Sequence, residues 1–423
     1  MCKEPSAPFL ATFNRVGFFW VGIIFAVLVT NAIYLFEVVI ATWWHTDYAI
    51  SSGGGFLRGN DFIAFWTAAD LALRGDFAAA YDVSTIQTVQ RQLVGVDNWG
   101  VMPWLYPPTF VLLLLPLGLL TYLSALALWQ TLPLVGFMFV MSRIGLPTVL
   151  FWLIPLSAAV VQTIVTGQNG LLTALLLGAG LLSLQRNPKM AGIFFALATF
   201  KPQLAVLIGP ALIFGRHWRA LGIMAAALAI LILVSVAVFG MEPWLAFFQN
   251  LTYAKEQVVL GKLPWRRMPT IFSAVLMSGG DANWAQIIQG MIALAATAGV
   301  AWAWWRPVQF NLRAALLVAA IPLVTPFAYD YDLVILLLPI AWLIVDSERI
   351  PLIHVEIAAM MLAWVLPTWW ALGLVRETDI QFGPLILSLL YGVILSRCIR
   401  EPMASARNNY SDTVNISKNA STN

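Results

Sequence analysis

The sequence predicts an all-α, polytopic integral membrane protein, and three observations support this fold class. Of the 423 residues, 61% are hydrophobic and only 10% are charged, and the mean hydropathy is +0.83. Soluble domains are about half apolar and about a quarter charged. A membrane-spanning helix needs about 20 apolar residues, and many such runs follow one another, so we expect about 10–13 transmembrane or re-entrant helices. The polar joints between the runs sort by charge, as they do in multi-pass proteins.

The composition also excludes several function classes. The net charge of +3 is small and scattered among apolar runs, which argues against a nucleic-acid partner. Cys2 and Cys398 lie near the chain ends, so neither a disulfide framework nor a thiolate metal site is expected. The histidines at 45, 217 and 354 are far apart and lack metal-ligand spacing. No nucleotide-binding glycine motif is present. We therefore expect no cofactor and no bound metal.

The first apolar run, residues 16–40, is too long for the core of a signal peptide and reads as a retained signal anchor. Residues 401–423 form a polar tail that we expect to be disordered. No solenoid repeat or separate soluble domain is evident between them. We therefore expect one transmembrane domain over residues 1–400, with a long outer loop at 41–104.

The charges of the joints predict the topology. Short basic joints should face the cytoplasm, because lysine and arginine are enriched on that side of membrane proteins. These joints contain Arg143, Arg186 with Lys189, Arg216 with Arg219, Arg306 with Arg313, and Arg397 with Arg400. Both termini are then cytoplasmic. The joints expected outside are 41–104, 167–170, 241–283, 325–332 and 373–380.

Two regions depart from simple spans. Residues 105–121 and 124–142 must together cross once, so the first is expected to be a short re-entrant or broken helix. Residues 190–200 and 204–215 are each too short to span at about 1.5 Å per residue. Lys201-Pro202-Gln203 lies between them. Broken helices at membrane depth are tolerated where their backbone lines protein or a wet cavity, so this break predicts a cavity.

Amphipathic helices are expected at the membrane surface. Within residues 61–73 one helical face carries Phe62, Phe65, Trp66, Ala69 and Leu73. Residues 83–94 and 242–262 show the same theme. Such helices usually lie in the interfacial plane with the apolar side toward lipid.

Asp61 is the first candidate for chemistry. It opens the helix at 61–73 after a glycine-rich stretch, and Arg58 precedes it by three residues. A carboxylate beside flexible backbone could act as a general base toward a hydroxyl nucleophile. From its spacing alone, an aspartate in this place is better explained as a helix N-cap.

Lys201 is the least expected residue, because it interrupts an apolar stretch and is followed by a proline. Charges within the membrane are rare and usually functional, and an ammonium could hold a phosphate oxygen. The alternative is a lysine that snorkels to the interface. Arg266 and Arg267 could similarly meet lipid phosphates, or form a solvated basic loop near anionic headgroups.

Polar residues gather at two further outer joints. Gln168 and Asn169 lie between glycines and offer amide groups, although turn chemistry explains such a pair as well. The Tyr329-Asp330-Tyr331-Asp332 segment combines two phenols with two carboxylates. An Asp-x-Asp pattern invites a divalent metal, but two carboxylates leave most ligands to phosphate and water. Aromatic and acidic side chains together also bind sugars.

In order along the chain, these segments resemble glycosyltransferase family 87, a group of polytopic enzymes of the GT-C type, over roughly residues 55–345. The motifs that carry the resemblance are Asn60-Asp61-Phe62, Ala80-Tyr81-Asp82, Tyr106-Pro107-Pro108, Gly167-Gln168-Asn169-Gly170, Lys201-Pro202, Met268-Pro269-Thr270-Ile271-Phe272-Ser273, and Thr325-Pro326 to Asp332.

The resemblance implies a GT-C-type fold and an outward-facing cavity in the bacterial inner (plasma) membrane. It implies a mannosyltransferase that uses polyprenyl-phosphate-mannose, with a glycolipid or glycan acceptor and membrane lipids as partners. Asp61 matches the family's base, and Lys201 matches a lysine near the donor phosphate. Arg266 and Arg267 would join Lys201, and substrate contacts are expected from Arg58, Tyr106, Gln168, Asn169, Gln203, Tyr329, Asp330, Tyr331 and Asp332.

One departure from the family pattern concerns its later motif. Relatives often carry histidine where this sequence has Tyr331 and Asp332, so the sugar or the acceptor can differ. The alternative function is a polyprenyl-lipid flippase or a small-molecule transporter, which also uses broken helices and buried charge. The crowding of polar residues on one side of the membrane favours the transferase.

Overall fold

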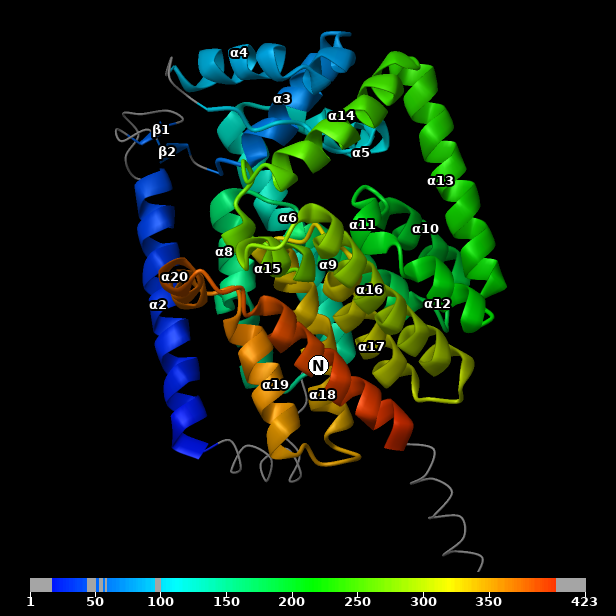
Figure 1. The fold of residues 1–423 in the computed structure, drawn as a ribbon. Helices are drawn as coiled ribbons and strands as arrows, with labels where there is room; N and C mark the ends of the chain where they lie inside the picture. Colours follow the sequence, from blue (N-terminus) through cyan, green and yellow to red (C-terminus); the bar gives the residue numbers. More distant parts are fainter. Residues whose placement is uncertain (1–16, 44–50, 53–55, 58, 96–99, 401–423) are drawn as a thin grey trace, which may run out of the picture.

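The computed structural model describes residues 17–43, 51–52, 56–57, 59–95 and 100–400. This part of the chain is almost entirely helical (Figure 1). Its strands are limited to β1 (Ser51–Ser52) and β2 (Phe56–Leu57), which pair antiparallel. Arg58, Cys2 and the 401–423 tail lie outside the described residues.

Helices of membrane-spanning length and composition confirm a polytopic membrane protein. Among the described residues, five helical segments are long and apolar enough to span: α6 (Tyr122–Ile144), α7 (Thr148–Leu153) together with α8 (Ala158–Thr166), α13 (Trp218–Phe239), α16 (Ala282–Trp305) and a final helix (Gly383–Arg400). The pair α19 (His354–Val365) and α20 (Trp369–Thr378) is bent by 86° and gives a sixth if counted as one span. Seven shorter apolar helices of 10–17 residues also occur among the described residues.

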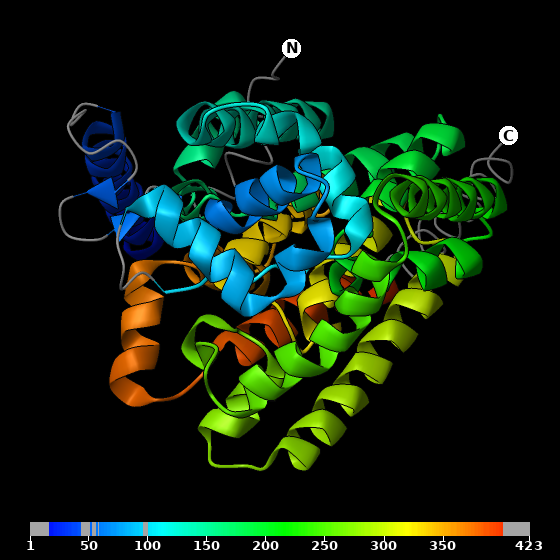
Figure 2. The ribbon, with the colours of Figure 1, turned by 90° about the horizontal axis from the view of Figure 1, so that it is seen from above.

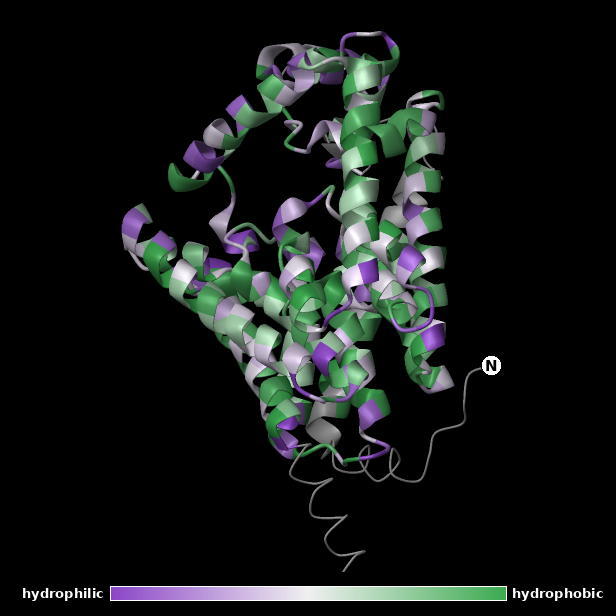
Figure 3. Cartoon of the chain, turned by 90° about the vertical axis from the view of Figure 1, so that its right-hand side faces the viewer, coloured by the Kyte–Doolittle hydropathy of each residue, from purple (hydrophilic) through white to green (hydrophobic). Residues whose placement is uncertain are grey.

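The first helix, α2 (Gly17–Trp43), stands at one side of the molecule, and α13 stands at the opposite side (Figure 1). Only 6% of the spanning window of α13 is buried by protein, and its surface is almost continuously hydrophobic (Figure 3). A helix that is apolar all round and has little protein cover is suited to contact with lipid. We therefore expect this helix to face lipid along most of its length.

A layer of short helices covers the upper end of the molecule in Figure 1, here called the α3 end. It consists of α3 (Phe62–Leu73), η1 (Phe77–Tyr81), α4 (Val83–Val94), α5 (Pro108–Gly118) and α14 (Glu242–Val259). Figure 2 shows this layer lying across the spanning helices when seen from above. The short helix expected before α6 is α5, which is eleven residues long and contains Pro116.

The helix at 61–73 is more deeply packed than its single apolar face predicts. Phe62, Phe65 and Ala69 are buried as expected, but Ile63 and Ala68 on other sides are buried too. The α3 helix is therefore enclosed by protein. By contrast, α4 has the expected amphipathic character, with Ile86, Gln90 and Val94 as its buried residues. The α14 helix exposes Leu245, Phe248 and Leu251.

The break at Lys201 is confirmed. The segment divides into α10 (Pro188–Ala198), α11 (Pro202–Ala205) and α12 (Ile208–Phe214). Lys201 occupies the N-cap position of α11, and Pro202 starts that helix. The remaining elements are η2 (Ile154–Leu156), α9 (Gly170–Ser183), η3 (Trp265–Arg267), α15 (Ile271–Met277), α17 (Phe310–Val324), η4 (Asp330–Leu336) and α18 (Leu337–Asp346).

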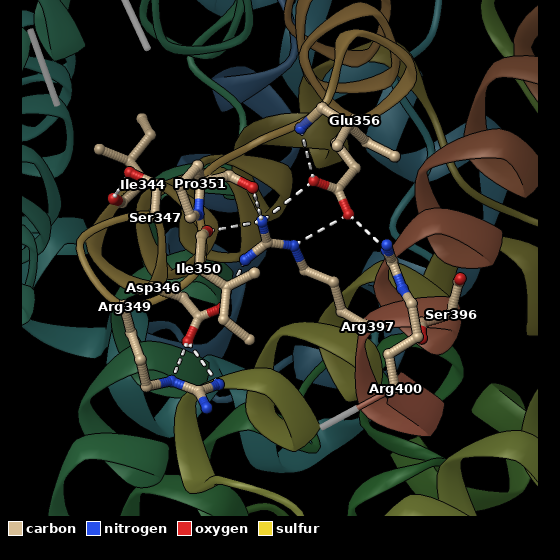
Figure 4. A network of polar contacts seen from close by, with 11 residues as sticks. Ile344, Asp346, Ser347, Arg349, Ile350, Pro351, Glu356, Ser396, Arg397 and Arg400 are labelled. Carbon is tan, nitrogen blue, oxygen red and sulfur yellow. Dashed lines mark hydrogen bonds and ion pairs between the residues drawn. The ribbon is translucent and has the colours of Figure 1, made fainter. Parts of the chain in front are cut away.

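A buried ion network joins α18, α19 and the final helix at the end opposite the α3 end (Figure 4). The Arg397 guanidinium donates to the carboxylates of Asp346 and Glu356 and to the carbonyl oxygens of Ile350 and Pro351. Its side chain is 2% exposed. Because the charges and backbone carbonyls satisfy one another, the network stabilises this end only while all its members are present.

Candidate functional site

A cavity of about 500 Å³ lies beneath the layer of short helices at the α3 end. It is bounded by side chains of α3 and α14, the 102–107 segment and the break at Lys201. Most of the site residues expected from the sequence line it: Asp61, Tyr106, Gln168, Lys201, Gln203, Arg267, Tyr329, Tyr331 and Asp332. The fold therefore gathers into one place residues that are up to 271 positions apart, from 61 to 332.

Backbone contact fixes Asp61 beside the joint between α8 and α9. The Asp61 amide donates to the carbonyl oxygen of Thr166 over 2.9 Å. Gly59 and Gly167 both have positive φ, and a Cβ on Gly167 would lie 3.1 Å from the Gly59 Cα and 2.7 Å from the Phe62 Cβ. Only glycine combines this backbone conformation with so close an approach. The two loops can therefore lie in direct contact.

Aromatic packing holds α3 in place. The Phe65 ring lies 5.3 Å from that of Tyr106, 5.4 Å from that of Trp129 and 5.8 Å from that of Phe110, all edge to face. Edge-to-face pairs stabilise beyond their buried area. The Trp129 indole also donates to the carbonyl oxygen of Gly167. Rigid packing directly behind Asp61 limits the positions its carboxylate can take.

The Asp61 side chain does not cap α3, although Asp61 occupies the N-cap position. Instead, Gln168 Nε2 donates to Asp61 Oδ2 over 2.9 Å, and Asp61 is 8% exposed. Burial raises the pKa of the Asp61 carboxyl above its ordinary value, while the Gln168 hydrogen bond and the charges of Arg267 and Lys201 oppose that rise. The Asp61 side chain therefore does not act as an N-cap, and its carboxylate lines the cavity instead.

Lys201 is buried against acidic and aromatic groups. Its Nζ donates to Asp332 Oδ1 and lies 4.9 Å from the centre of the Tyr331 ring. Lys201 is 3% exposed, so its ammonium does not snorkel to an interface. Asp332 Oδ2 accepts from the Tyr329 amide, which orients the carboxylate. The ammonium has further donor capacity for a ligand oxygen in the cavity.

Arg267 forms a second ion pair at the edge of the same cavity. Its Nε and Nη2 donate to the two oxygens of Asp330, each over 2.9 Å, in bidentate geometry. The guanidinium also lies 5.8 Å from the Tyr331 ring centre. Because Asp330 pairs with Arg267 while Asp332 pairs with Lys201, the two carboxylates of the Asp-x-Asp are directed to different bases. Their arrangement fits charge compensation better than joint metal binding.

Phenol and amide groups complete the cavity wall. The Tyr329 and Tyr331 rings are stacked, with centres 5.4 Å apart and planes at 7°. Asn169 Nδ2 donates to the Tyr106 hydroxyl over 2.9 Å. Asn169 is therefore a buried support for Tyr106, whereas Tyr106 itself lines the cavity. Flat rings and hydrogen-bonding groups in one wall suit a sugar ring with its hydroxyls.

Arg266 does not line this cavity, and neither do the predicted residues Asn169 and Asp330. Arg266 pairs with Asp379 at the surface, where both side chains are more than half exposed. Lys255 on α14 also lines the cavity, although it was not among the site residues predicted from the sequence. The amphipathic pattern of residues 242–262 could have indicated this position, because Phe247 and Val258 of the same helix also line the cavity.

The model of glycosyltransferase family 87 matches residues 104–326, more than half of the chain. The chain belongs to glycosyltransferase family 87. It is therefore a membrane glycosyltransferase with a donor and an acceptor substrate, and the flippase or transporter alternative is set aside. The range that matches family 87 includes the break at Lys201 and the joint with Gln168, whereas Asp61 and Asp332 lie outside that range. No curated protein and no solved structure matches the chain.

Proposed function

We propose that this protein transfers a sugar, with mannose as the first candidate, from a polyprenyl phosphate to a hydroxyl of a glycolipid or glycan. The observation that carries the proposal is the cavity that holds both a buried carboxylate and a buried ammonium. Asp61 supplies a base with a raised pKa, and Lys201 supplies a positive charge for a phosphate. A GT-C-type architecture is part of the same proposal.

The proposed reaction is a direct displacement. The Asp61 carboxylate accepts the proton of the acceptor hydroxyl, and the hydroxyl oxygen forms a bond to the anomeric carbon. The bond between that carbon and the phosphate oxygen breaks, and its electron pair leaves with the polyprenyl phosphate. A single displacement inverts the configuration at the anomeric carbon. General-base assistance typically contributes about 10²–10⁴ in rate.

The leaving phosphate gains negative charge as the bond breaks. Lys201 and Arg267 line the cavity and are already held by Asp332 and Asp330, so they need little reorganisation. Preorganised charge of this kind stabilises a transition state more than mobile solvent does. A monophosphate carries less charge than a diphosphate, so these bases are sufficient in our proposal and a chelator should have no effect.

The orientation is also a proposal. Four of the basic joints adjoin the helix ends that lie away from the α3 end, and they contain Arg143, Arg186, Arg216 and Arg306. The course of α13 illustrates this arrangement (Figure 1). The positive-inside rule would place those joints and both termini in the cytoplasm. The cavity would then open toward the outer face of the inner membrane.

A donor survey tests the proposed activity. Purified protein in lipid would be incubated with host lipid extract and radiolabelled polyprenyl phosphates that carry mannose, glucose or arabinose. We expect label to move to a lipid-extractable or polymeric product from one donor, equally with and without chelator. Analysis of the product linkage by nuclear magnetic resonance should give the configuration opposite to that of the donor. Retained configuration would contradict direct displacement, and transfer that requires a metal would contradict the role given to Lys201 and Arg267.

A further inference from the structure

A second group of cavities lies behind Arg267, outside the candidate active site. One cavity of about 500 Å³ is lined by Arg266, Arg267, Arg376 and Asp379, together with residues around η3 and the end of α15. An apolar cavity of about 290 Å³ adjoins it between α19, α20 and the final helix. Arg267 lines both of them and also the cavity that contains Asp61, here called the catalytic cavity for its proposed role. The three spaces therefore meet at one side chain.

The loop that separates these spaces is firmly held. The Gln381 side-chain amide donates to the carbonyl oxygens of Trp265 and Arg266, and Gln381 is buried. Gly383 lies so close to Pro269 that a Cβ there would collide with the proline. The segment carrying Arg266 and the segment after α20 are thus packed backbone to backbone. The cavities between them are built into the fold.

The polar cavity has an excess of positive charge. Its lining contains three arginines and one aspartate. Asp379 pairs with Arg266, and Asp330 pairs with Arg267. Arg376 has no hydrogen-bond or ion-pair partner among the described residues. An anion bound there would therefore pair with Arg376 without displacing a carboxylate from that side chain. Guanidinium groups match the geometry of phosphate oxygens well.

The neighbouring cavity is suited to a hydrocarbon chain. Apart from Arg266, Arg267, Asp330 and Gln381 at one side, its lining is apolar: Pro269, Leu333, Leu362, Val365, Leu366, Trp370, Ala371, Leu372, Leu374, Val375, Phe382 and Ile386. Trp369 and Trp370 are exposed at the start of α20, and tryptophan favours the membrane interface. The helix α20 lies at 86° to α19, across the direction of a spanning helix (Figure 2).

We propose that Arg266 and Arg376 bind the phosphate of an anionic lipid whose hydrocarbon chain lies in the apolar cavity, and that this lipid is the acceptor. The inference rests on the proposed function, in which Lys201 takes the donor phosphate. A headgroup held by Arg266 and Arg376 adjoins Arg267 and can extend past it into the cavity that contains Asp61. Two lipid phosphates would then flank Arg267 from opposite sides.

Native mass spectrometry of the detergent-purified protein tests the site without turnover. The probes are dioleoyl phosphatidic acid, dioleoylglycerol, which lacks the phosphate, and inorganic phosphate, which lacks the chain. We expect phosphatidic acid to bind more tightly than either of the others. Arg376→Gln should weaken its binding by about tenfold or more, because a charge-assisted contact is lost. Ala371→Trp, which fills the apolar cavity, should weaken phosphatidic acid but not inorganic phosphate.

Two controls separate this inference from the proposed function. Arg306→Gln removes an exposed arginine elsewhere and should leave phosphatidic acid binding unchanged. Asp61→Asn should also bind it as the wild type does, since Asp61 lines only the catalytic cavity among these spaces. Equal affinity of the wild type and Arg376→Gln for phosphatidic acid would overturn the site. Binding of dioleoylglycerol or inorganic phosphate as tight as that of phosphatidic acid would overturn its assignment to a lipid phosphate.

The acceptor role has its own readout in the transfer assay. Arg376→Gln should raise the KM for the acceptor lipid by about tenfold and leave the KM for the donor unchanged. A rise in the donor KM alone would contradict the role as acceptor site. If the wild type transfers no sugar while phosphatidic acid binding still depends on Arg376, the proposed function fails and the lipid site stands.

Discussion

Gln168 and Asp61, 107 residues apart in the sequence, are joined by a hydrogen bond of 2.9 Å from the amide nitrogen to the carboxylate. Gln168 follows Gly167, whose close contact with Gly59 brings the two loops together. The amide favours the charged form of the carboxylate and so opposes the rise in its pKa that burial causes. In the proposed mechanism, Gln168 positions Asp61 to accept a proton.

The pH dependence of transfer should report this hydrogen bond. A general base works when deprotonated, so kcat/KM should rise with pH through the pKa of Asp61, which lies above 3.8 because the group is buried. Gln168→Leu removes the donor that lowers this pKa, so the acid limb should move to higher pH. Steady-state profiles of kcat/KM against pH for the two proteins measure the shift of the acid limb. An unchanged limb would separate Gln168 from the ionisation that limits the rate.

Single and double variants should show that Lys201 supplies a charge for catalysis and that Asp332 is its counter-ion. Lys201→Gln should lower kcat/KM by about 10²–10³, as loss of a preorganised charge does. It should also lower thermal stability, because Asp332 is left buried without its partner. The double variant Lys201→Gln/Asp332→Asn should regain stability without regaining activity. Recovery of both together would mean that Lys201 is a structural residue only.

Gly170 should tolerate no side chain. A Cβ there would collide with the carbonyl oxygen of Tyr331 and lie 2.9 Å from Thr163 Oγ1, so α9 and η4 would have to separate. We expect Gly170→Ala to cost about 1–3 kcal/mol of stability and to lower transfer by disturbing Tyr331. Gly222→Ala is the matched control, since a Cβ at Gly222 meets nothing within 4 Å. Thermal unfolding and initial rates check both. Equal behaviour of the two variants would refute the close approach.

The Arg397 network should govern stability but not chemistry. Arg397→Gln leaves Asp346 and Glu356 buried with fewer partners, which typically costs about 3–5 kcal/mol. The unfolding temperature should fall clearly, while the rate per folded molecule at low temperature stays near that of the wild type. Arg143→Gln, at an exposed position, should change neither. A selective loss of transfer in Arg397→Gln would instead couple the two ends of the molecule.

Much of the architecture was predictable because hydrophobic run length and prolines are local signals. The runs predicted the spans, and the short segments around Lys201-Pro202 predicted the break between α10 and α11. The short α5 followed from the need for a single crossing before Arg143. The enclosure of α3 was not predictable, since its cover comes from Trp104, Phe110 and Trp129, which are distant in sequence.

The site residues were predictable as types but not as partners. A lysine in an apolar run and an aspartate after glycines stood out individually. Nothing local assigned Lys201 to Asp332, 131 residues away, or Arg267 to Asp330. The neighbouring arginines Arg266 and Arg267 were expected to act together, yet one lies at the surface with Asp379 and the other at the catalytic cavity. Such divergence depends on backbone direction in η3, which the sequence does not specify.

The most direct test of the account is the transfer rate of Asp61→Asn compared with that of the wild type, using the labelled donor that the wild type accepts. Asp76→Asn is the matched control, because Asp76 is an exposed aspartate in the same region that lines none of the cavities described above. We predict that Asp61→Asn, folded and still able to bind donor, transfers about 10²–10⁴ times more slowly, while Asp76→Asn keeps the wild-type rate. Transfer by Asp61→Asn near the wild-type rate would contradict the assignment of Asp61 as the base.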